Sequence, residues 1–200
     1  MDAADADTLL LILQDPNSSD SSLSETVRDI VMLGDMRAKA PLMQRLRQVN
    51  DPHWVRRDLV LALGGLMASE AKDLLLGLLN SEEEYSDVRR AAILSLGMIR
   101  AGDAVRPLIS IVQSGKPSDL VYPSVIALGD IGDPSAVEAL VFALQSHEPL
   151  VPQSAAQALA RIGAAAASAI PRLLQLATTG NETERRFASE AITKIHGHAK

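Results

Sequence analysis

A short repeat runs from one end of this 200-residue chain to the other and constrains its fold more than any other feature. A Leu-Gly or Ile-Gly dipeptide marks each copy of the repeat: Leu33-Gly34, Leu63-Gly64, Leu96-Gly97, Leu128-Gly129 and Ile162-Gly163. Counting back from these dipeptides places the starts of the repeats near positions 25, 55, 88, 120, 151 and 184, at nearly equal intervals. A period of this length is typical of stacked helical units.

Each repeat has the apolar pattern of two amphipathic helices, which we name the A helix and the B helix. In the third A helix, small or apolar residues follow a helical spacing and form one stripe: Val88, Ala91, Ala92, Ser95, Leu96 and Ile99. A glycine at the end of the A helix favours a left-handed C-terminal turn. An aspartate in the next turn, such as Asp133, is expected to cap the free N–H groups of the following helix.

The B helices align on two inward positions that lie one helical turn apart. The first position is occupied by Leu42, Leu74, Leu108, Leu140 and Leu173, and the second by Leu46, Leu78, Val112, Leu144 and Ala177. A single helical hairpin cannot bury both of its apolar faces, so neighbouring hairpins must stack. The sequence therefore predicts an all-α fold, a right-handed α-solenoid (an α–α superhelix) of helical hairpins. By analogy with other helical repeats, we expect the B helices on its concave side.

The repeats predict one domain that spans residues 1–200. It comprises a lone helix near residues 7–14, five hairpins that start near residues 25, 55, 88, 120 and 151, and a lone A helix from about residue 184. Asp15–Ser24 is the most loop-like segment. Because Pro123 has no N–H to donate, the fourth A helix is expected to begin near Tyr122 rather than at Ser118, or to bend there.

Two segments carry a resemblance to a known repeat: VRRAA from Val88, with Leu96-Gly97 after it, and ALGDIGDPSAVEAL from Ala127. They resemble the short HEAT-like repeat that is named after the phycobilisome (PBS) bilin lyases, and the resemblance extends over about residues 25–196. It implies HEAT-like repeats in an armadillo-type superhelix. Members of this family include E/F-type lyases, which attach bilins to phycobiliproteins, and proteins that serve only as binding scaffolds. The chain matches no lyase catalytic motif, so no catalytic residue is assigned.

Composition and charge exclude several classes of site. The net charge is −6, which disfavours nucleic acid as a partner, and the absence of cysteine excludes a thiolate nucleophile or a zinc–thiolate site. The acidic N-terminus has only a short apolar run, so we expect a cytoplasmic protein without a signal peptide or a membrane partner. His147-Glu148 is a solitary pair, so no metal site is predicted.

Two sets of side chains allow more than one interpretation. The pairs Arg56-Arg57, Arg89-Arg90 and Arg185-Arg186 form either a basic stripe for an acidic partner or a structural ladder that bonds helix ends and acidic turns. We favour the ladder, although the pairs do not continue through the fourth and fifth repeats. Trp54, Tyr85 and Tyr122 stand near the starts of successive A helices, where they line one end of the stack or pack across turns; we favour packing across turns.

The outward positions of the B helices carry the predicted partner-binding site. In hairpins two to four these positions hold Lys72, Leu76, Arg106, Ser110, Glu138 and Phe142. Leu76 and Phe142 are apolar where a helix without a partner is expected to be polar. Apolar anchors within a polar surround are typical of contact surfaces.

We therefore interpret the chain as a non-enzymatic protein–protein interaction scaffold without a cofactor, which binds a protein partner on the concave B-helix face. The alternative is an E/F-type phycobilin lyase or bilin-handling subunit, with a phycobiliprotein or a second lyase subunit as its partner. In that case a bilin would bind in the groove, and Lys72 and Arg106 are candidates to meet its propionates. A nucleic-acid-binding helical repeat is disfavoured by the charge and by the scarcity of aromatic residues.

Overall fold

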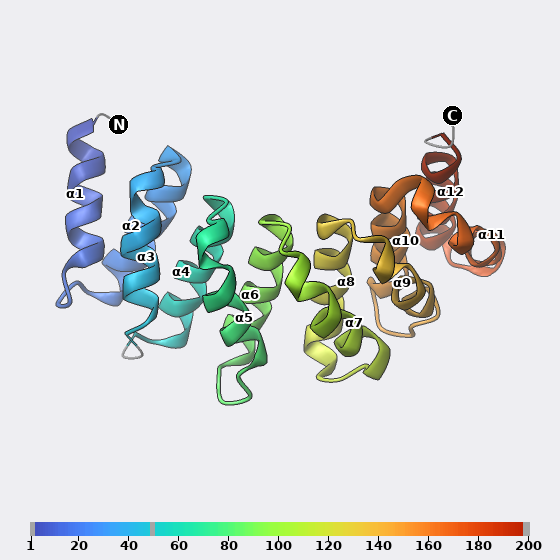
Figure 1. Cartoon of the computed structure of the whole chain (residues 1–200), viewed down its shortest axis with the longest axis horizontal. Helices are drawn as coiled ribbons and strands as arrows, with labels where there is room; N and C mark the ends of the chain where they lie inside the picture. Colours follow the sequence, from blue (N-terminus) through green and yellow to red (C-terminus); the bar gives the residue numbers. More distant parts are fainter. Residues whose placement is uncertain (1–2, 49–50, 198–200) are drawn as a thin grey trace. The chain divides into compact units, whose positions relative to one another are not determined.

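The computed structural model describes residues 3–48 and 51–197, with side chains from residue 6 onward, and this part of the chain is helical without a strand (Figure 1). Its α-helices are α1 (Ala3–Gln14), α2 (Asp20–Leu33), α3 (Lys39–Leu46), α4 (His53–Gly65), α5 (Lys72–Asn80), α6 (Ser86–Met98), α7 (Val105–Ser114), α8 (Ser118–Ile131), α9 (Val137–Ala143), α10 (Val151–Ile162), α11 (Ile170–Thr179) and α12 (Glu182–Gly197). The predicted all-α fold is confirmed. Within the described ranges, no helix combines the length and the apolar character needed to cross a membrane.

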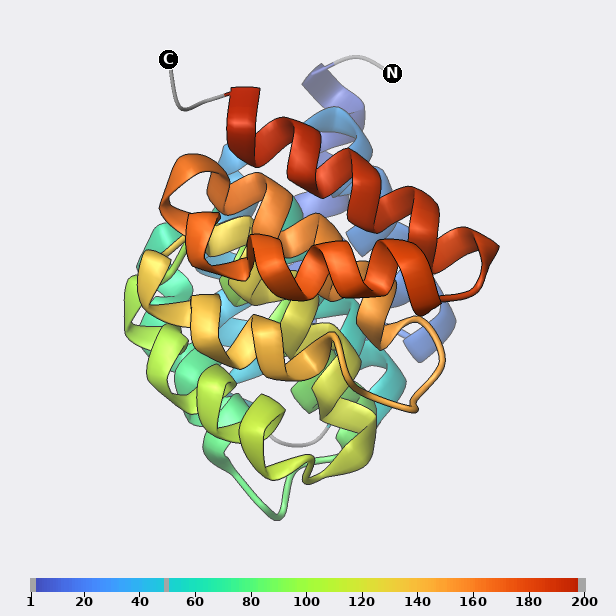
Figure 2. The ribbon, with the colours of Figure 1, turned by 90° about the vertical axis from the view of Figure 1, so that its right-hand side faces the viewer.

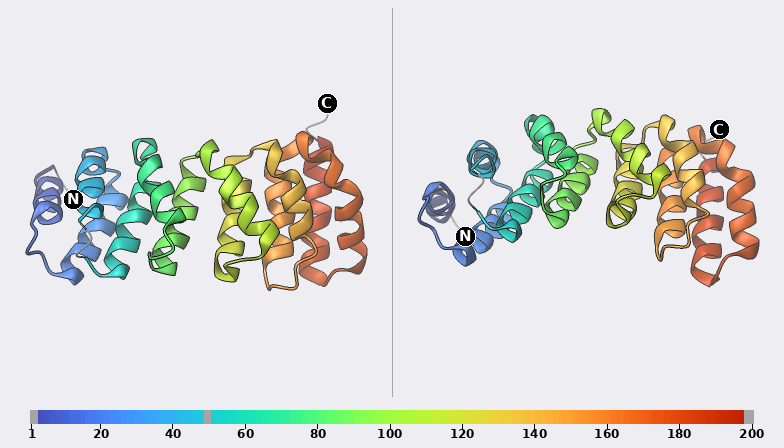
Figure 3. Two further views of the ribbon diagram at one scale, coloured as in Figure 1. Left: turned by 60° about the horizontal axis from the view of Figure 1, so that its bottom comes forward. Right: turned by 90° about the horizontal axis from the view of Figure 1, so that it is seen from below.

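The chain divides into two compact units, Met1–Ile99 and Arg100–Lys200. In the N-terminal unit the A helices α2, α4 and α6 pack in succession, and the B helices α3 and α5 pack against the A helices that follow them. In the C-terminal unit α8, α10 and α12 pack in succession, and α7, α9 and α11 each pack against the next A helix. Figure 2 shows α11 and α12 side by side, and Figure 3 shows the hairpins from two further directions. Each unit is therefore a stack of helical hairpins.

A short 3-10 helix leads into every B helix and sets its register. These segments are η1 (Met36–Ala38), η2 (Ser69–Ala71), η3 (Gly102–Ala104), η4 (Pro134–Ala136) and η5 (Gly163–Ala169), and each of them ends in an alanine with no exposed surface. One helical turn after each alanine stands a fully buried leucine: Leu42, Leu75, Leu108, Leu140 and Leu173. The small alanine side chain and the leucine thus form the inward stripe of each B helix.

The predicted register of the second B helix is wrong by one residue. The sequence placed Leu74 and Leu78 on the inward stripe, but the positions equivalent to Leu42 and Leu46 are Leu75 and Leu79, which are 0% and 1% exposed. Leu78 is also buried, at 8% exposure, whereas Leu74 is partly exposed. The segment Leu74–Leu79 has leucine at five of its six positions, so the apolar pattern fits several registers, and the packing of Ala71 at the end of η2 selects one of them. The inward positions predicted for α3, α7 and α9 are confirmed.

Helices α1, α2 and α8 begin earlier than predicted, with α1 starting at Ala3 rather than near residue 7. Helix α2 starts at Asp20, inside the segment expected to be a loop, because the Ser19 hydroxyl accepts a hydrogen bond from the backbone N–H of Ser22 and caps the helix. Helix α8 starts at Ser118 and continues through Pro123, which is buried. A proline removes only one backbone N–H donor, so Pro123 does not prevent the fourth A helix from beginning before Tyr122.

The left-handed residue at the end of an A helix is not always glycine. Gly34 and Gly132 adopt this conformation, as the sequence predicted, with φ angles of 66° and 77°. Met67 and Arg100 adopt it at the equivalent ends of α4 and α6, with φ angles of 51° and 52°. The predicted cap Asp133 accepts the backbone N–H of Ser135 at 2.8 Å, whereas the cap position of η3 is Ala101, which has no side-chain acceptor. The position of a residue in the repeat, more than its type, therefore determines whether it adopts the left-handed conformation at the end of an A helix.

Glycine within the A helices permits a close contact between neighbouring helices. A Cβ atom on Gly64 in α4 would lie 2.6 Å from Ser95 Oγ and 2.9 Å from Ser95 Cα in α6. Ser95 is fully buried, and its hydroxyl donates a hydrogen bond to the Val60 carbonyl of α4 at 2.8 Å. In the C-terminal unit Gly129 of α8 has the same relation to Ala158 of α10. Small residues of the A helices therefore bring these pairs of helices together.

We expect Gly64→Ala to lower the free energy of unfolding by about 1–3 kcal/mol, because the added methyl group would overlap Ser95. The matched control is Gly77→Ala in α5, where a Cβ would meet no atom within 4 Å. Replacing this helical glycine with alanine should instead raise stability by about 0.5–1 kcal/mol. Urea unfolding of both variants measures the difference, and a shift of the same sign for the two substitutions would contradict the close contact.

Candidate partner-binding surfaces

Phe142 stands beside an apolar hollow in the C-terminal unit. Its side chain is 53% exposed, although it occupies α9 in the interior of the repeat array. The hollow has a volume of about 360 Å³ and is lined by Phe142, Ala143, Val112, Val121 and Val151, together with the loop that follows α9. The valines come from α7, α8 and α10, and of these only Val112 was predicted from the sequence, as an inward residue of its B helix. An aromatic ring at the rim of such a hollow is a suitable anchor for an apolar side chain of a partner.

The loop after α9 separates this hollow from a second, more polar one. Ser146, His147 and Glu148 line both hollows. The polar hollow has a volume of about 660 Å³ and is also lined by Asn181, just before α12, and by Glu182 and Glu184 in the first turn of α12. In the described residues no group of three or more histidine and carboxylate side chains is placed to hold a metal ion.

The structure separates the six predicted binding residues into two groups. Arg106 and Ser110 lie exposed one turn apart on α7, and Glu138 and Phe142 lie exposed one turn apart on α9, which packs against α7. Lys72 and Leu76 belong to α5 of the other unit, and both are only partly exposed. With the corrected register, the outward positions of α5 are Asp73 and Gly77, both exposed. Leu76 therefore does not occupy the outward position that the sequence assigned to it.

Leu76 instead belongs to a position that is apolar in every B helix. Immediately after the buried leucine, the five B helices carry Met43, Leu76, Ile109, Val141 and Leu174, and none of these side chains is fully buried. Leu174 is 52% exposed. This partly exposed apolar position was not recognised from the sequence, because the wrong register of α5 aligned Leu76 with a different position of the other B helices.

The first arginine of two of the pairs forms the predicted structural ladder. Arg56 in α4 donates to the Leu46 carbonyl at the end of α3, and Arg89 in α6 donates to the equivalent Leu79 carbonyl at the end of α5. Arg56 also forms an ion pair with Glu84. In contrast, Arg57 is 41% exposed and pairs with its neighbour Asp58. The first arginine thus connects a B helix to the next A helix and is not available to a partner.

Three rings gather at the start of α4 and the loop before α6. The His53 ring stacks on Tyr85 with a centroid distance of 4.7 Å and meets Trp54 edge-on at 5.2 Å. His53 Nδ1 donates to Asp87 Oδ2 at 2.8 Å. Partial burial raises the pKa of Asp87, but the hydrogen bond and the charge of His53 outweigh it and hold that pKa below its usual value. Tyr85 therefore packs on the preceding A helix rather than across its own turn, and Trp54, Tyr85 and Tyr122 remain exposed.

Solved structures with this arrangement of hairpins include both natural and designed proteins. The chain superposes on a designed armadillo repeat protein in complex with the peptide (KR)4 with a TM-score of 0.70, at 18% identity, over 94% of this chain and 98% of the other. It superposes on the complex of CpcE and CpcF of phycocyanin lyase from Nostoc sp. PCC7120 with a TM-score of 0.65, at 21% identity, over 80% of this chain and 66% of the other. An engineered protein is similar over 99% of this chain and 98% of its own length, with a TM-score of 0.63 and 19% identity. At these identities the likeness concerns the fold.

A family comparison agrees with the hairpin stack, although no curated protein sequence matches the chain. HEAT repeats match in three overlapping segments, residues 6–97, 39–121 and 105–193. These segments include the buried alanines and leucines of all five B helices and the A helices that pack in succession in each unit. The repeat in the sequence, the hairpins in the structure and the matched segments therefore agree that this chain belongs to the family of HEAT repeat proteins.

Proposed function

We propose that the protein is a non-enzymatic scaffold that binds a protein partner on the exposed side of its B helices, with Phe142 as the principal anchor. The observation that carries this proposal is the half-exposed Phe142 ring beside an apolar hollow of about 360 Å³. HEAT repeat folds suit protein binding, since stacked hairpins present long rows of side chains from successive helices.

The surround of Phe142 supports a protein as the ligand. Glu138 lies one turn before it on α9, and Arg106 and Ser110 lie exposed on the neighbouring α7. Binding energy at protein interfaces is concentrated in a few aromatic or apolar anchors that a polar rim shields from water. Val141 and Ile109, which are partly exposed on the same two helices, extend the apolar part of this surface.

Phe142→Ser should weaken capture of the partner without unfolding the protein, because the exposed ring contributes little to the core. Loss of one such anchor is worth about 1–2 kcal/mol of binding free energy, which corresponds to a five- to thirtyfold increase in Kd. The measurement is quantitative pull-down from an extract of the source organism, followed by titration of the recovered partner. Leu76→Ser should weaken partner capture less than Phe142→Ser does, since the Leu76 side chain is partly buried in α5.

The matched control is Tyr122→Ser, which removes an exposed ring from the A helix α8 of the same unit. It should leave partner capture unchanged. Equal capture by wild-type protein and Phe142→Ser, together with loss of capture in Tyr122→Ser, would assign the binding surface to the A helices instead.

A second candidate function is supported by the likeness to the CpcE and CpcF complex of phycocyanin lyase. Under this reading the protein handles a bilin, and exposed Arg106 is available to meet a propionate, with partly exposed Lys72 as a further candidate. Mixing the protein with a linear tetrapyrrole tests it directly. A saturable shift in visible absorbance that Arg106→Ser weakens would favour this candidate, whereas an unchanged spectrum would favour the scaffold.

A further inference from the structure

The rings of His53, Trp54 and Tyr85 form an exposed patch in the N-terminal unit. Trp54 is 45% exposed and Tyr85 is 61% exposed, in a chain that has only five Trp, Tyr and Phe residues. Large rings that stay exposed beside one another are unusual on a protein surface without a partner, because burying such a ring is favourable. The patch belongs to the N-terminal unit, whereas the Phe142 hollow belongs to the C-terminal unit.

The patch is held in place by polar contacts that are partly buried or exposed. The side chain of Glu84 accepts hydrogen bonds from the guanidinium of Arg56 and from the backbone N–H of Tyr85. Asp87 accepts the hydrogen bond of His53 and also that of the Val88 backbone N–H. A surface whose side chains are already ordered loses less conformational entropy when a partner binds.

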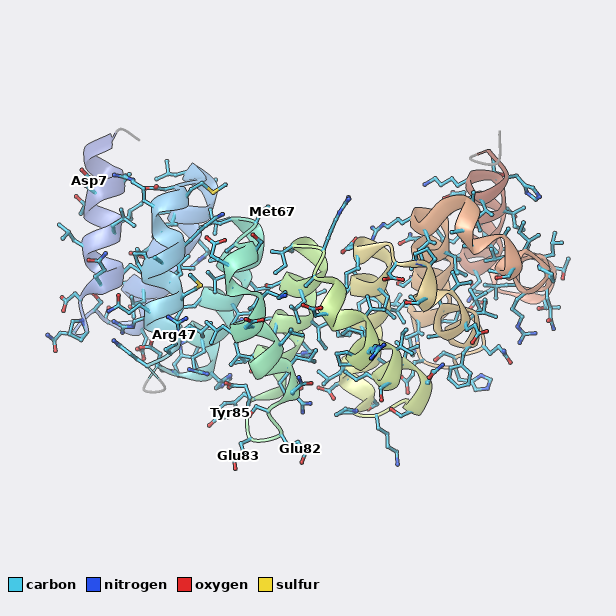
Figure 4. The ribbon with its side chains drawn as sticks, in the orientation of Figure 1. Asp7, Arg47, Met67, Glu82, Glu83 and Tyr85 are labelled. Atoms are coloured by element: carbon cyan, nitrogen blue, oxygen red, sulfur yellow. The ribbon has the colours of Figure 1, made fainter. Side chains whose placement is uncertain are left out.

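The charge around the patch selects a cationic partner. Glu82 and Glu83 are exposed and project together with Tyr85 from the loop between α5 and α6 (Figure 4). The nearby cation Arg57 is paired with Asp58. The N-terminal unit as a whole has sixteen Asp and Glu residues against ten Lys and Arg residues, whereas the C-terminal unit has nine of each. The entire net charge of −6 therefore lies in the unit that carries the patch.

We propose that Trp54, His53 and Tyr85, together with Glu82 and Glu83, form a docking surface for an arginine-containing basic segment of a partner protein. A guanidinium group stacks on an aromatic face through its plane and its charge, and its N–H groups pair with carboxylates in a bidentate geometry. Trp54 and Tyr85 offer the faces, and the two glutamates offer the carboxylates. This surface does not depend on the function proposed for Phe142.

The experiment uses Trp54 as a reporter, since it is the only tryptophan of the chain. The full-length protein is titrated at low ionic strength with the capped synthetic peptide (Arg-Ser)4, and tryptophan emission is recorded. We expect a saturable change in emission. Tyr85→Ser should raise Kd about two- to fivefold through loss of one cation–π partner at an exposed site. Glu82→Gln with Glu83→Gln should raise Kd by a similar factor and flatten its dependence on salt, because screened charge pairs would be removed.

Three controls separate this surface from general electrostatic attraction. Glu25→Gln with Asp73→Asn removes the same charge from exposed positions of α2 and α5 and should leave Kd nearly unchanged. Phe142→Ser should bind the peptide as the wild type does, and (Glu-Ser)4 should not alter the emission. Absence of a saturable change, an equal loss of affinity in the two double variants, or preferential binding of (Glu-Ser)4 would each overturn the proposal. If Tyr85→Ser fails to fold, the two double variants still distinguish a local binding site from general electrostatic attraction.

Discussion

Replacing Arg56 with methionine is expected to lower the free energy of unfolding by about 3–5 kcal/mol, the loss typical of removing one partner of a buried ion pair. The Arg56 side chain is 7% exposed and that of Glu84 is 10% exposed, so the variant would leave a buried carboxylate without its counter-ion. It would also remove the donor to the Leu46 carbonyl at the end of α3. Urea unfolding followed by circular dichroism measures the change.

The neighbouring residue provides the control for Arg56. Arg57→Met removes the same charge from an exposed pair with Asp58 and should cost less than about 1 kcal/mol. The double variant Arg56→Met with Glu84→Gln should be more stable than Arg56→Met alone, because no charge is then left buried. Equal losses in Arg56→Met and Arg57→Met would mean that the ladder does not support the fold.

Leu75→Ala is expected to destabilise the protein by about 2–5 kcal/mol, since this leucine is fully buried on the inward stripe of α5 and the smaller side chain would leave a cavity. Leu74→Ala changes the adjacent, partly exposed leucine and should cost about 1 kcal/mol, in proportion to the smaller apolar area that it buries. Unfolding by urea distinguishes the two. A larger loss for Leu74→Ala would restore the register that the apolar pattern suggested.

A comparison of alanine substitutions at Leu108 and Ser110 in α7 tests whether equivalent positions of the repeat contribute equally to stability in different hairpins. Leu108 is fully buried and Ser110 is exposed, as the sequence predicted for this helix. The difference between α5 and α7 lies in their composition. Helix α7 has polar residues that define one register, whereas leucine occupies five of six positions from Leu74 to Leu79. The alanine that ends each 3-10 helix was a usable signal, because Ala38, Ala71 and Ala104 recur at equal intervals along the chain.

The candidate binding site was predictable in part. The exposure of Phe142 followed from its offset relative to Leu140, and the structure confirms it. The hollow beside it did not follow from the sequence, because its valine walls come from three other helices and have the same residue type as any core position. The predicted outward position of Leu76 was wrong, because the predicted register of α5 was wrong by one residue. Binding at these residues remains a proposal that the pull-down and titration experiments test.

The sequence by itself determined the helical class, the length of the repeat, and the pairing of A and B helices. These are properties of local spacing, since the helical period and the longer period of the hairpins recur whatever the packing. Only the tertiary structure decided which leucine of α5 faces the core, how Met67 and Arg100 came to adopt left-handed conformations, and that Trp54 and Tyr85 form one exposed patch with His53. Contacts between one repeat and the next, such as His53 with Asp87 and Gly64 with Ser95, fix these features, and no single helix contains the information for them.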